Sequence, residues 1–326
     1  MTQIKKAPNF LEDGHLVPGV RAFLKSINTG GPGVETLSIE QARKVLVDLQ
    51  NATPVNLSGI EESEKTITTE GHHIKLTIVR PEGVKATLPA FMFIHGGGWV
   101  LGDYPTHRRL VRDIVVASGF AAVFVNYTPS PEAPYPQATE EIYAATKWVA
   151  ANGHEINVDG KTLAIVGNSV GGNMTAVTCL KSMANSGPVI KLAVMMWPIV
   201  DANFEHESYQ LFGEDRFLTT PLMKWMYDTY TKDPKERKEI YASPLEATVE
   251  QLKGFPPALI QVAENDVLRD GGEAFGRKLA EAGGEICTVR YNGVIHDWGL
   301  LNGLAGITET KALIAQISIA LKNHLK

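Results

Sequence analysis

One serine stands in a sequence pattern that can activate a hydroxyl as a nucleophile. Residues 167–172 read Gly-Asn-Ser-Val-Gly-Gly, which places Ser169 in a G-x-S-x-G pattern after a short apolar run and before apolar residues at helical spacing. A sharp turn between a strand and a helix needs small neighbours, which Gly167 and Gly171 provide. The pattern therefore predicts a nucleophilic Ser169, with the Val170 amide at the positive helix end, pointing toward an oxygen that becomes negative.

A run of three glycines offers further amide donors. Residues 95–99 read His-Gly-Gly-Gly-Trp and directly follow an apolar run. Without side chains, such a loop can bring its amides close to a substrate oxygen, so Gly97 and Gly98 are expected to donate together with Val170. A phosphate-binding loop or a plain structural turn is the alternative, but no Lys-Ser/Thr follows and no G-x-G-x-x-G spacing occurs. His95 is expected to brace the loop through hydrogen bonds.

A serine nucleophile needs a general base and a carboxylate that orients the base. His296 lies in a loop directly after the last apolar run, where the base is expected. The loop after the preceding run offers Glu264, Asp266 and Asp270, and Asp266 is preferred because Asp270 is close to the next helix and Glu264 to the end of the strand. His206 lies in a polar segment and is expected at the surface. The same is expected of His15, His72, His73, His107 and His154.

These residues require a sheet that brings distant segments together. Short apolar runs without polar alternation are typical of strands buried on both faces, and here they alternate with helical segments, which predicts a parallel sheet in an α/β fold. In residues 65–80 apolar and polar side chains alternate more regularly, which predicts an antiparallel hairpin at the sheet edge. The apolar runs are 88–94, 121–126, 162–166, 192–197, 257–263 and 286–291.

Two regions interrupt the alternation and predict a cap. We expect residues 1–50 to form its N-terminal part and residues 201–245 an insertion, both at the carboxyl edge of the sheet, where open α/β sheets bind ligands. Residues 51–200 and 246–326 then form the two parts of the catalytic domain. The alternative is that the helix of the insertion merely packs on its own scaffold.

Each cap region contains a helix with recognisable start signals. Ser38 is expected to cap the first helix, with Gln41 reaching back. Thr220 is expected to cap the second helix, with Pro221 as its first residue.

Composition excludes several classes of function. The formal net charge is −5 and the sequence pI is near 6.0, without a basic run, so a nucleic-acid partner is not expected. The two cysteines, Cys179 and Cys287, lack the spacing of a disulfide framework or a metal site and are expected to be buried thiols. No apolar stretch reaches ~18 residues, so no membrane span is expected and a cytoplasmic location is predicted. The oligomeric state stays open, with a homodimer as one option.

Together these motifs resemble the hormone-sensitive-lipase-like family of α/β hydrolases, which includes bacterial carboxylesterases related to arylacetamide deacetylase. The resemblance spans about residues 65–305 and includes the segment 126–138, which reads Asn-Tyr-Thr-Pro-Ser-Pro-Glu-Ala-Pro-Tyr-Pro-Gln-Ala. It implies an eight-stranded, mostly parallel sheet with helices on both faces and a helical cap. It also implies hydrolysis of short- to medium-chain carboxylic esters through an acyl-enzyme, without a cofactor or a metal. Ser169, Asp266 and His296 match the family's catalytic triad, and Gly97, Gly98 and Val170 match its oxyanion hole.

The chain departs from the family pattern in three places. Asn168 and Val170 flank the nucleophile where the family usually has Asp and Ala. The acid motif at residues 266–271 reads Asp-Val-Leu-Arg-Asp-Gly, where the family usually has D-P-L-R-D-E. Loss of the charge at 168 is expected to alter loop bracing and the pH profile, and the bulkier Val170 to narrow the site. Two other functions remain open: amide hydrolysis by the same triad, and ligand binding without catalysis as in the plant gibberellin receptors. The second is disfavoured because those receptors lack the histidine that His296 supplies.

Overall fold

The computed structural model describes residues 6–325, in which eight strands form a sheet in the order β1-β2-β4-β3-β5-β6-β7-β8. The pairs β1-β2 and β2-β4 are antiparallel and all other neighbouring strands are parallel. The predicted mostly parallel sheet with an antiparallel hairpin at one edge is confirmed. The strands are β1 (Ile60–Thr69), β2 (His72–Pro81), β3 (Leu88–Ile94), β4 (Ala121–Asn126), β5 (Val158–Asn168), β6 (Ile190–Met196), β7 (Ala258–Asn265) and β8 (Ile286–Ile295).

Strand ends differ from the sequence prediction where backbone pairing continues past the apolar residues. The bounds of β3 and β4 agree with the predicted runs, whereas β5 extends to Asn168 because Gly167 and Asn168 still pair with β6. Strand β8 likewise continues to Ile295. Both extensions carry the chain directly to a candidate site residue, since Ser169 and His296 follow these two strands.

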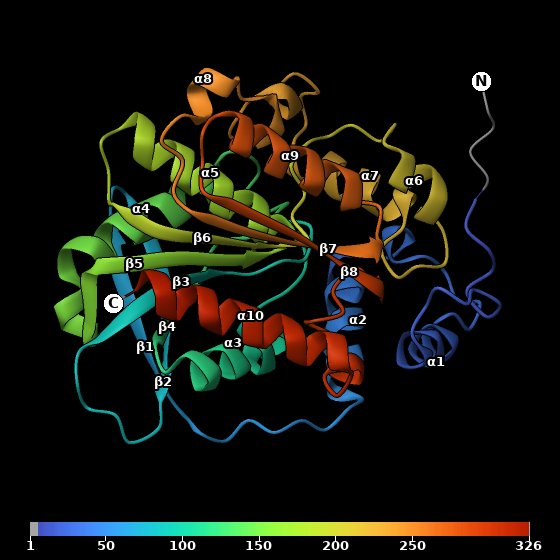
Figure 1. Ribbon diagram of the computed structural model, residues 1–326, viewed down its shortest axis with the longest axis horizontal. Helices are drawn as coiled ribbons and strands as arrows, with labels where there is room; N and C mark the ends of the chain where they lie inside the picture. Colours follow the sequence, from blue (N-terminus) through green and yellow to red (C-terminus); the bar gives the residue numbers. More distant parts are fainter. Residues whose placement is uncertain (1–5, 326) are drawn as a thin grey trace.

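Helices cover both faces of the sheet. Helices α3 and α10 lie on one face, and α4, α5 and α9 on the other (Figure 1). The helices are α1 (Pro18–Ile27), α2 (Ile39–Asn51), α3 (Tyr104–Ser118), α4 (Gln137–Asn152), α5 (Val170–Ala184), α6 (Glu207–Phe212), α7 (Thr220–Tyr230), α8 (Val249–Leu252), α9 (Arg269–Glu281) and α10 (Thr308–His324).

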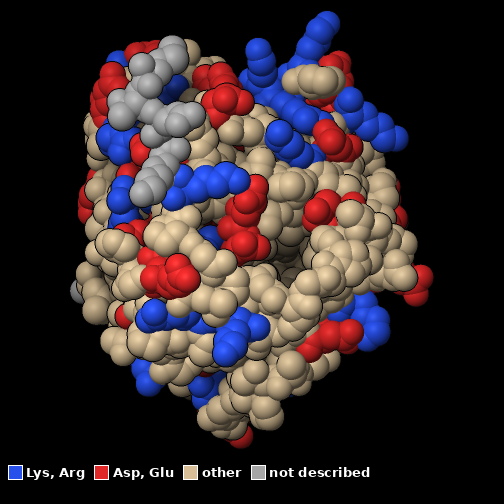
Figure 2. Space-filling model, turned by 90° about the vertical axis from the view of Figure 1, so that its right-hand side faces the viewer, with Lys and Arg blue, Asp and Glu red and all other residues tan. Residues whose placement is uncertain are grey.

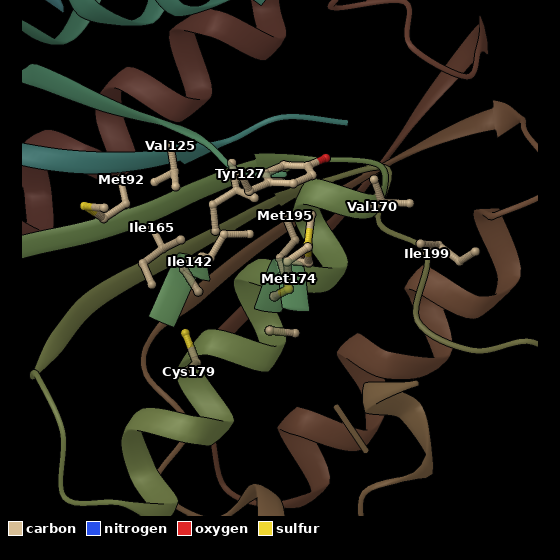
Figure 3. Close-up of a cluster of buried hydrophobic side chains, with 14 of the residues drawn as sticks. Met92, Val125, Tyr127, Ile142, Ile165, Val170, Met174, Cys179, Met195 and Ile199 are labelled. Atoms are coloured by element: carbon tan, nitrogen blue, oxygen red, sulfur yellow. The ribbon is translucent and has the colours of Figure 1, made fainter. Parts of the chain in front are cut away.

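The core consists of two clusters, one on each face of the sheet. Successive side chains of a strand point to opposite faces, so Met92 belongs to one cluster and Phe91 to the other. Figure 3 shows Met92 and Met195 of the sheet facing Met174 and Cys179 of α5. Cys179 is buried as predicted.

The prediction of a second buried thiol is wrong, because Cys287 is exposed. It lies near the start of β8, the edge strand of the sheet, where much of the strand faces solvent.

Helices α1, α2, α6 and α7 lie beyond the carboxyl ends of the parallel strands (Figure 1). The start of α2 agrees with the sequence, since Ser38 and Gln41 form a capping box. The start of α7 is shifted by one residue, because the hydroxyl of Thr219 accepts the Leu222 amide at 3.3 Å. Of the two adjacent threonines that can cap, the first has the extended backbone that a cap requires.

The face formed by these helices is hollowed near its centre, and the hollow is bordered largely by side chains without formal charge (Figure 2). Within residues 6–325, no helix is both long enough and apolar enough to cross a lipid bilayer.

Candidate active site

Ser169 occupies a strained turn between β5 and α5. Its backbone has φ 55° and ψ −121°, a left-handed conformation that non-glycine residues seldom adopt. A Cβ at Gly171 would collide with the carbonyl of Ile94, and one at Gly167 with the carbonyl of Gly171. The two glycines therefore permit the turn, which leaves the serine side chain at the end of the sheet with 5% of the residue surface exposed.

His296 and Asp266 meet Ser169 at this edge of the sheet. The Nε2 atom of His296 lies 3.1 Å from Oγ of Ser169, and its Nδ1 lies 2.7 Å from Oδ2 of Asp266. The other oxygen of Asp266 accepts the Leu268 amide at 3.0 Å, which fixes the carboxylate. The adjacent parallel strands β7 and β8 end next to each other and hold the acid and the imidazole in place. The three predicted residues thus form one hydrogen-bonded chain.

A second carboxylate, Asp297, lies on the other side of the imidazole. Its Oδ2 is 3.8 Å from Nε2 of His296, beyond hydrogen-bond distance. Burial opposes a charge on His296, but the carboxylates of Asp266 and Asp297 outweigh it and raise the pKa of the imidazole above its usual value. Burial also raises the pKa of Asp297. The site therefore favours the positive imidazolium that forms when a base accepts a proton.

The glycine loop presents amides next to the serine. Gly97 and Gly98 have φ of 111° and 62°, and Val170 is the first residue of α5. Within residues 6–325, none of these three amides donates a hydrogen bond. Gly98 and Val170 are buried and Gly97 is half-buried. Because buried amides normally have partners, these free donors are suited to a developing oxyanion.

Two buried histidines support the loop in their neutral forms. Nδ1 of His95 lies 2.8 Å from the carbonyl of Gly96, and Nε2 of His107 accepts the Gly96 amide at 3.3 Å. Burial lowers the pKa of His95 to about 4 and the pKa of His107 well below its usual value. The bracing expected of His95 agrees with this geometry. The surface position expected for His107 is wrong, because the side chain turns inward from α3 under the glycine loop.

His206 is also less exposed than expected. Its Nε2 lies 2.8 Å from Oδ2 of Asp201, and this hydrogen bond raises the pKa of the imidazole. The polar sequence around His206 gives no sign of the pairing, because it depends on how the segment between β6 and α6 folds back to bring Asp201, five residues earlier, against the imidazole.

Sequence reasoning did not identify three further residues next to the site. They are Asp297, the residue that follows His296; Trp197, whose Nε1 donates to Asp297 at 2.7 Å; and Met226 of α7. The sulfur of Met226 packs on the α-carbon of Gly98, so that a Cβ there would collide with it. Of the three, only Asp297 could have been noticed in the sequence, because it directly follows the candidate base His296. Within residues 6–325, no cluster of three or more His, Cys, Asp or Glu side chains is arranged to hold a metal ion.

Comparison with known proteins agrees with this geometry. The model of a family described as having the alpha/beta hydrolase fold matches residues 91–300. The structure of a thermostable esterase from Pseudomonas putida ECU1011 is similar with a TM-score of 0.95 and 54% identity, covering 96% of this chain and 99% of that one. A mutant of the esterase rPPE in complex with (S)-Ac-CPA is similar with the same TM-score, identity and coverage.

Comparison of sequences also finds a relative that hydrolyses carboxylic esters, as its name states. The carboxylic ester hydrolase LipN of Mycobacterium tuberculosis is 33% identical over 309 residues, which cover 90% of this chain and 79% of LipN. The chain is a carboxylic ester hydrolase and belongs to the hormone-sensitive-lipase-like family of α/β hydrolases.

Proposed function

We propose that the chain hydrolyses short- to medium-chain carboxylic esters in two steps, with Ser169 as nucleophile, His296 as general base and Asp266 as the acid that orients it. Ser169 attacks the ester carbonyl while His296 takes its proton, and the amides of Gly97, Gly98 and Val170 stabilise the oxyanion. His296 then gives the proton to the leaving alcohol. Water, activated by the same imidazole, hydrolyses the acyl-enzyme. None of these steps requires a cofactor.

The observation that carries the proposal is the continuous hydrogen-bonded chain from Ser169 Oγ through His296 to Asp266, at 3.1 and 2.7 Å. A serine hydroxyl is a weak nucleophile unless a base is within hydrogen-bond reach, and the base needs a third group to fix its tautomer. Asp266 bonds to Nδ1, which leaves Nε2 free to face the serine.

Labelling of the nucleophile tests the proposal. A fluorophosphonate probe is expected to modify Ser169, and Ser169→Ala is expected to lose labelling and esterase turnover on p-nitrophenyl acetate, with kcat falling by at least about 1,000-fold. Ser208→Ala, which alters a buried serine that bonds the carbonyl of Val267, is the matched control and should remain labelled. Undiminished turnover by Ser169→Ala would refute the mechanism.

Two carboxylates flank His296, so the assignment of the acid needs its own test. Asp266→Asn is expected to lower kcat by up to about 10,000-fold, because an amide cannot hold the imidazole in the required tautomer. Asp297→Asn is expected to have a much smaller effect, because Asp297 makes no hydrogen bond to the ring. The reverse order of effects would reassign the acid to Asp297.

Residues 1–50 and 201–245 are proposed to act as a cap that limits the size of the substrate; the first five residues of the N-terminal part lie outside the described residues. Support comes from Met226 of α7, which packs on Gly98 in the glycine loop. A side chain in that position leaves little space beside the proposed oxyanion site and favours small ester groups.

Three finer assignments remain proposals with separate tests. Preference for esters over amides is measured by parallel kinetics on a matched p-nitrophenyl ester and p-nitroanilide. A cytoplasmic location is tested by cell fractionation. A homodimer is tested by sedimentation velocity.

A further inference from the structure

Asn168, the residue directly before Ser169, links two parts of the site. Its side chain is fully buried at the end of β5. Its Oδ1 accepts the amide of Gly96 in the glycine loop at 3.0 Å, and its Nδ2 donates to Oδ1 of Asp297 at 3.3 Å. The side chain therefore connects the loop of proposed oxyanion donors with the turn that carries His296.

The two partners determine which kind of side chain can stand at position 168. The Gly96 amide can only donate, and an ionised carboxylate can only accept. A side chain that satisfies both needs an acceptor and a donor on one rigid group, which an amide provides. A carboxylate at this position could still accept from Gly96, but it would face Asp297 as a second acceptor and a second negative charge.

Asp297 is itself held firmly. Its backbone has φ 59°, and its Oδ1 also accepts Nε1 of Trp197 at 2.7 Å. Burial raises its pKa, while the charge of His296 and the donors on Trp197 and Asn168 favour the ionised form. The turn that contains Asp297 is therefore held firmly and cannot easily move to relieve repulsion from a carboxylate at position 168.

A Cβ on Gly96 would lie 2.5 Å from Nδ2 of Asn168, so the loop and the amide are in close contact. Any displacement of the side chain at 168 is therefore transmitted to the backbone of the glycine loop, and with it to Gly97 and Gly98.

We propose that Asn168 is a positioning residue for the glycine loop and that Asp297 is the reason an amide is required there. The inference rests on the proposed function, because it concerns how the oxyanion donors are held relative to Ser169. Asn168 acts through the Gly96 backbone and does not touch the reacting atoms.

Charged and titratable side chains surround the contact between Asn168 and Asp297, and their protonation must be considered in any pH experiment on it. His296 faces Asp297 directly, and Asp266 lies across the imidazole ring. From α3, Arg109 reaches the carbonyls of Gly299 and Leu300 in the same turn. His107, on the other side of Gly96, stays neutral because burial lowers its pKa.

A double-mutant cycle of Asn168→Asp and Asp297→Asn tests the proposal. Asn168→Asp alone is expected to lower kcat on p-nitrophenyl acetate by roughly 10- to 100-fold with little change in KM, because displaced oxyanion donors affect the transition state more than substrate binding. Asp297→Asn alone is expected to lower kcat less. The double variant again has one carboxylate and one amide at the contact, so its kcat should return to within about threefold of Asp297→Asn alone.

A pH series gives a readout that general loss of structure would not produce. Two facing carboxylates share a proton more readily as pH falls, so the kcat of Asn168→Asp relative to that of wild type should rise between pH 8 and pH 6, as the shared proton restores a donor. The kcat of the double variant relative to that of Asp297→Asn should stay constant over the same range, because neither of these variants has two facing carboxylates.

The matched control is Asn152→Asp, which removes the same kind of amide donor at the end of α4, where Asn152 bonds the carbonyl of Trp148. Equal losses in Asn168→Asp and in the double variant would overturn the proposal, as would wild-type kcat in Asn168→Asp. If Asn168→Asp does not fold, a folded and active double variant supports the pairing and an unfolded one contradicts it. Failure of the proposed function would appear separately, as full activity in Ser169→Ala.

Discussion

The imidazole of His296 lies between two carboxylates that differ in geometry. Asp266 forms a hydrogen bond with Nδ1, whereas Asp297 approaches the Nε2 side at 3.8 Å without one. Both raise the pKa of the ring against the effect of burial. At the scale of single residues, the orientation of the ring therefore comes from Asp266, while both carboxylates favour the positive charge on the imidazole.

This charge balance predicts the pH profile. A general base must be neutral, so kcat/KM should fall as pH decreases through the pKa of His296, which lies above its usual value of 6.5. Asp297→Asn removes one of the two charges that raise this pKa, so the acidic limb should move to lower pH. The measurement is kcat/KM for an uncharged ester between pH 5 and pH 9. A limb that moves to higher pH would contradict the assignment of His296 as the base.

At the scale of elements, local patterns located most of the strands and the candidate residues at their ends. Apolar runs and glycine patterns are local, so Ser169, Asp266 and His296 could be selected from sequence, and the structure brings them within hydrogen-bond distance; their catalytic roles stay predictions. The contact between Asn168 and Asp297 could not be predicted. It depends on how the ends of β5 and β8 converge, and no local pattern records that distance.

The contact that helix α7 makes with the glycine loop also could not be predicted from the sequence. This contact provides a test of substrate size. The start of the helix was expected from the sequence to within one residue, but the contact between Met226 and Gly98 depends on how the helix lies over the loop. Met226→Ala should open space beside the loop and raise the ratio of kcat/KM for p-nitrophenyl octanoate over acetate by roughly tenfold.

The control for this change is Met183→Ala near the end of α5, about 20 Å along the helix from Ser169 at 1.5 Å per residue. It should leave the ratio unchanged. An unaltered chain-length profile in Met226→Ala would show that α7 does not limit the substrate.

At the scale of the whole molecule, the N-terminal segment is joined to the insertion far along the chain. Arg216 and Asp13 form an ion pair at 2.8 Å in which each side chain is 3% exposed, and Arg216 also donates to the carbonyl of Pro8. Near α6, Lys6 and Glu214 form a second ion pair between the same segments, but these side chains are 67% and 70% exposed. The two proposed parts of the cap are thus connected by one buried and one solvated pair.

The difference in burial predicts unequal effects on stability. Asp13→Ala leaves the Arg216 charge buried without its partner and should lower the free energy of unfolding by about 3–5 kcal/mol. Glu214→Ala should cost less than about 1 kcal/mol, because solvent screens an exposed pair. Urea denaturation of both variants measures the difference. Equal losses would show that the buried pair is not a specific connection between the two segments.

The positions of the proposed acid and the proposed base along the chain have a consequence for biosynthesis. Asp266 and His296 both lie in the final fifth of the sequence, and they follow the last two strands of the sheet. A ribosome-bound chain that ends before β8 contains Ser169 and the glycine loop but lacks His296 and the strand that precedes it. If Ser169, Asp266 and His296 form the proposed triad, hydrolytic activity begins only after β8 and His296 have been synthesised and have left the exit tunnel.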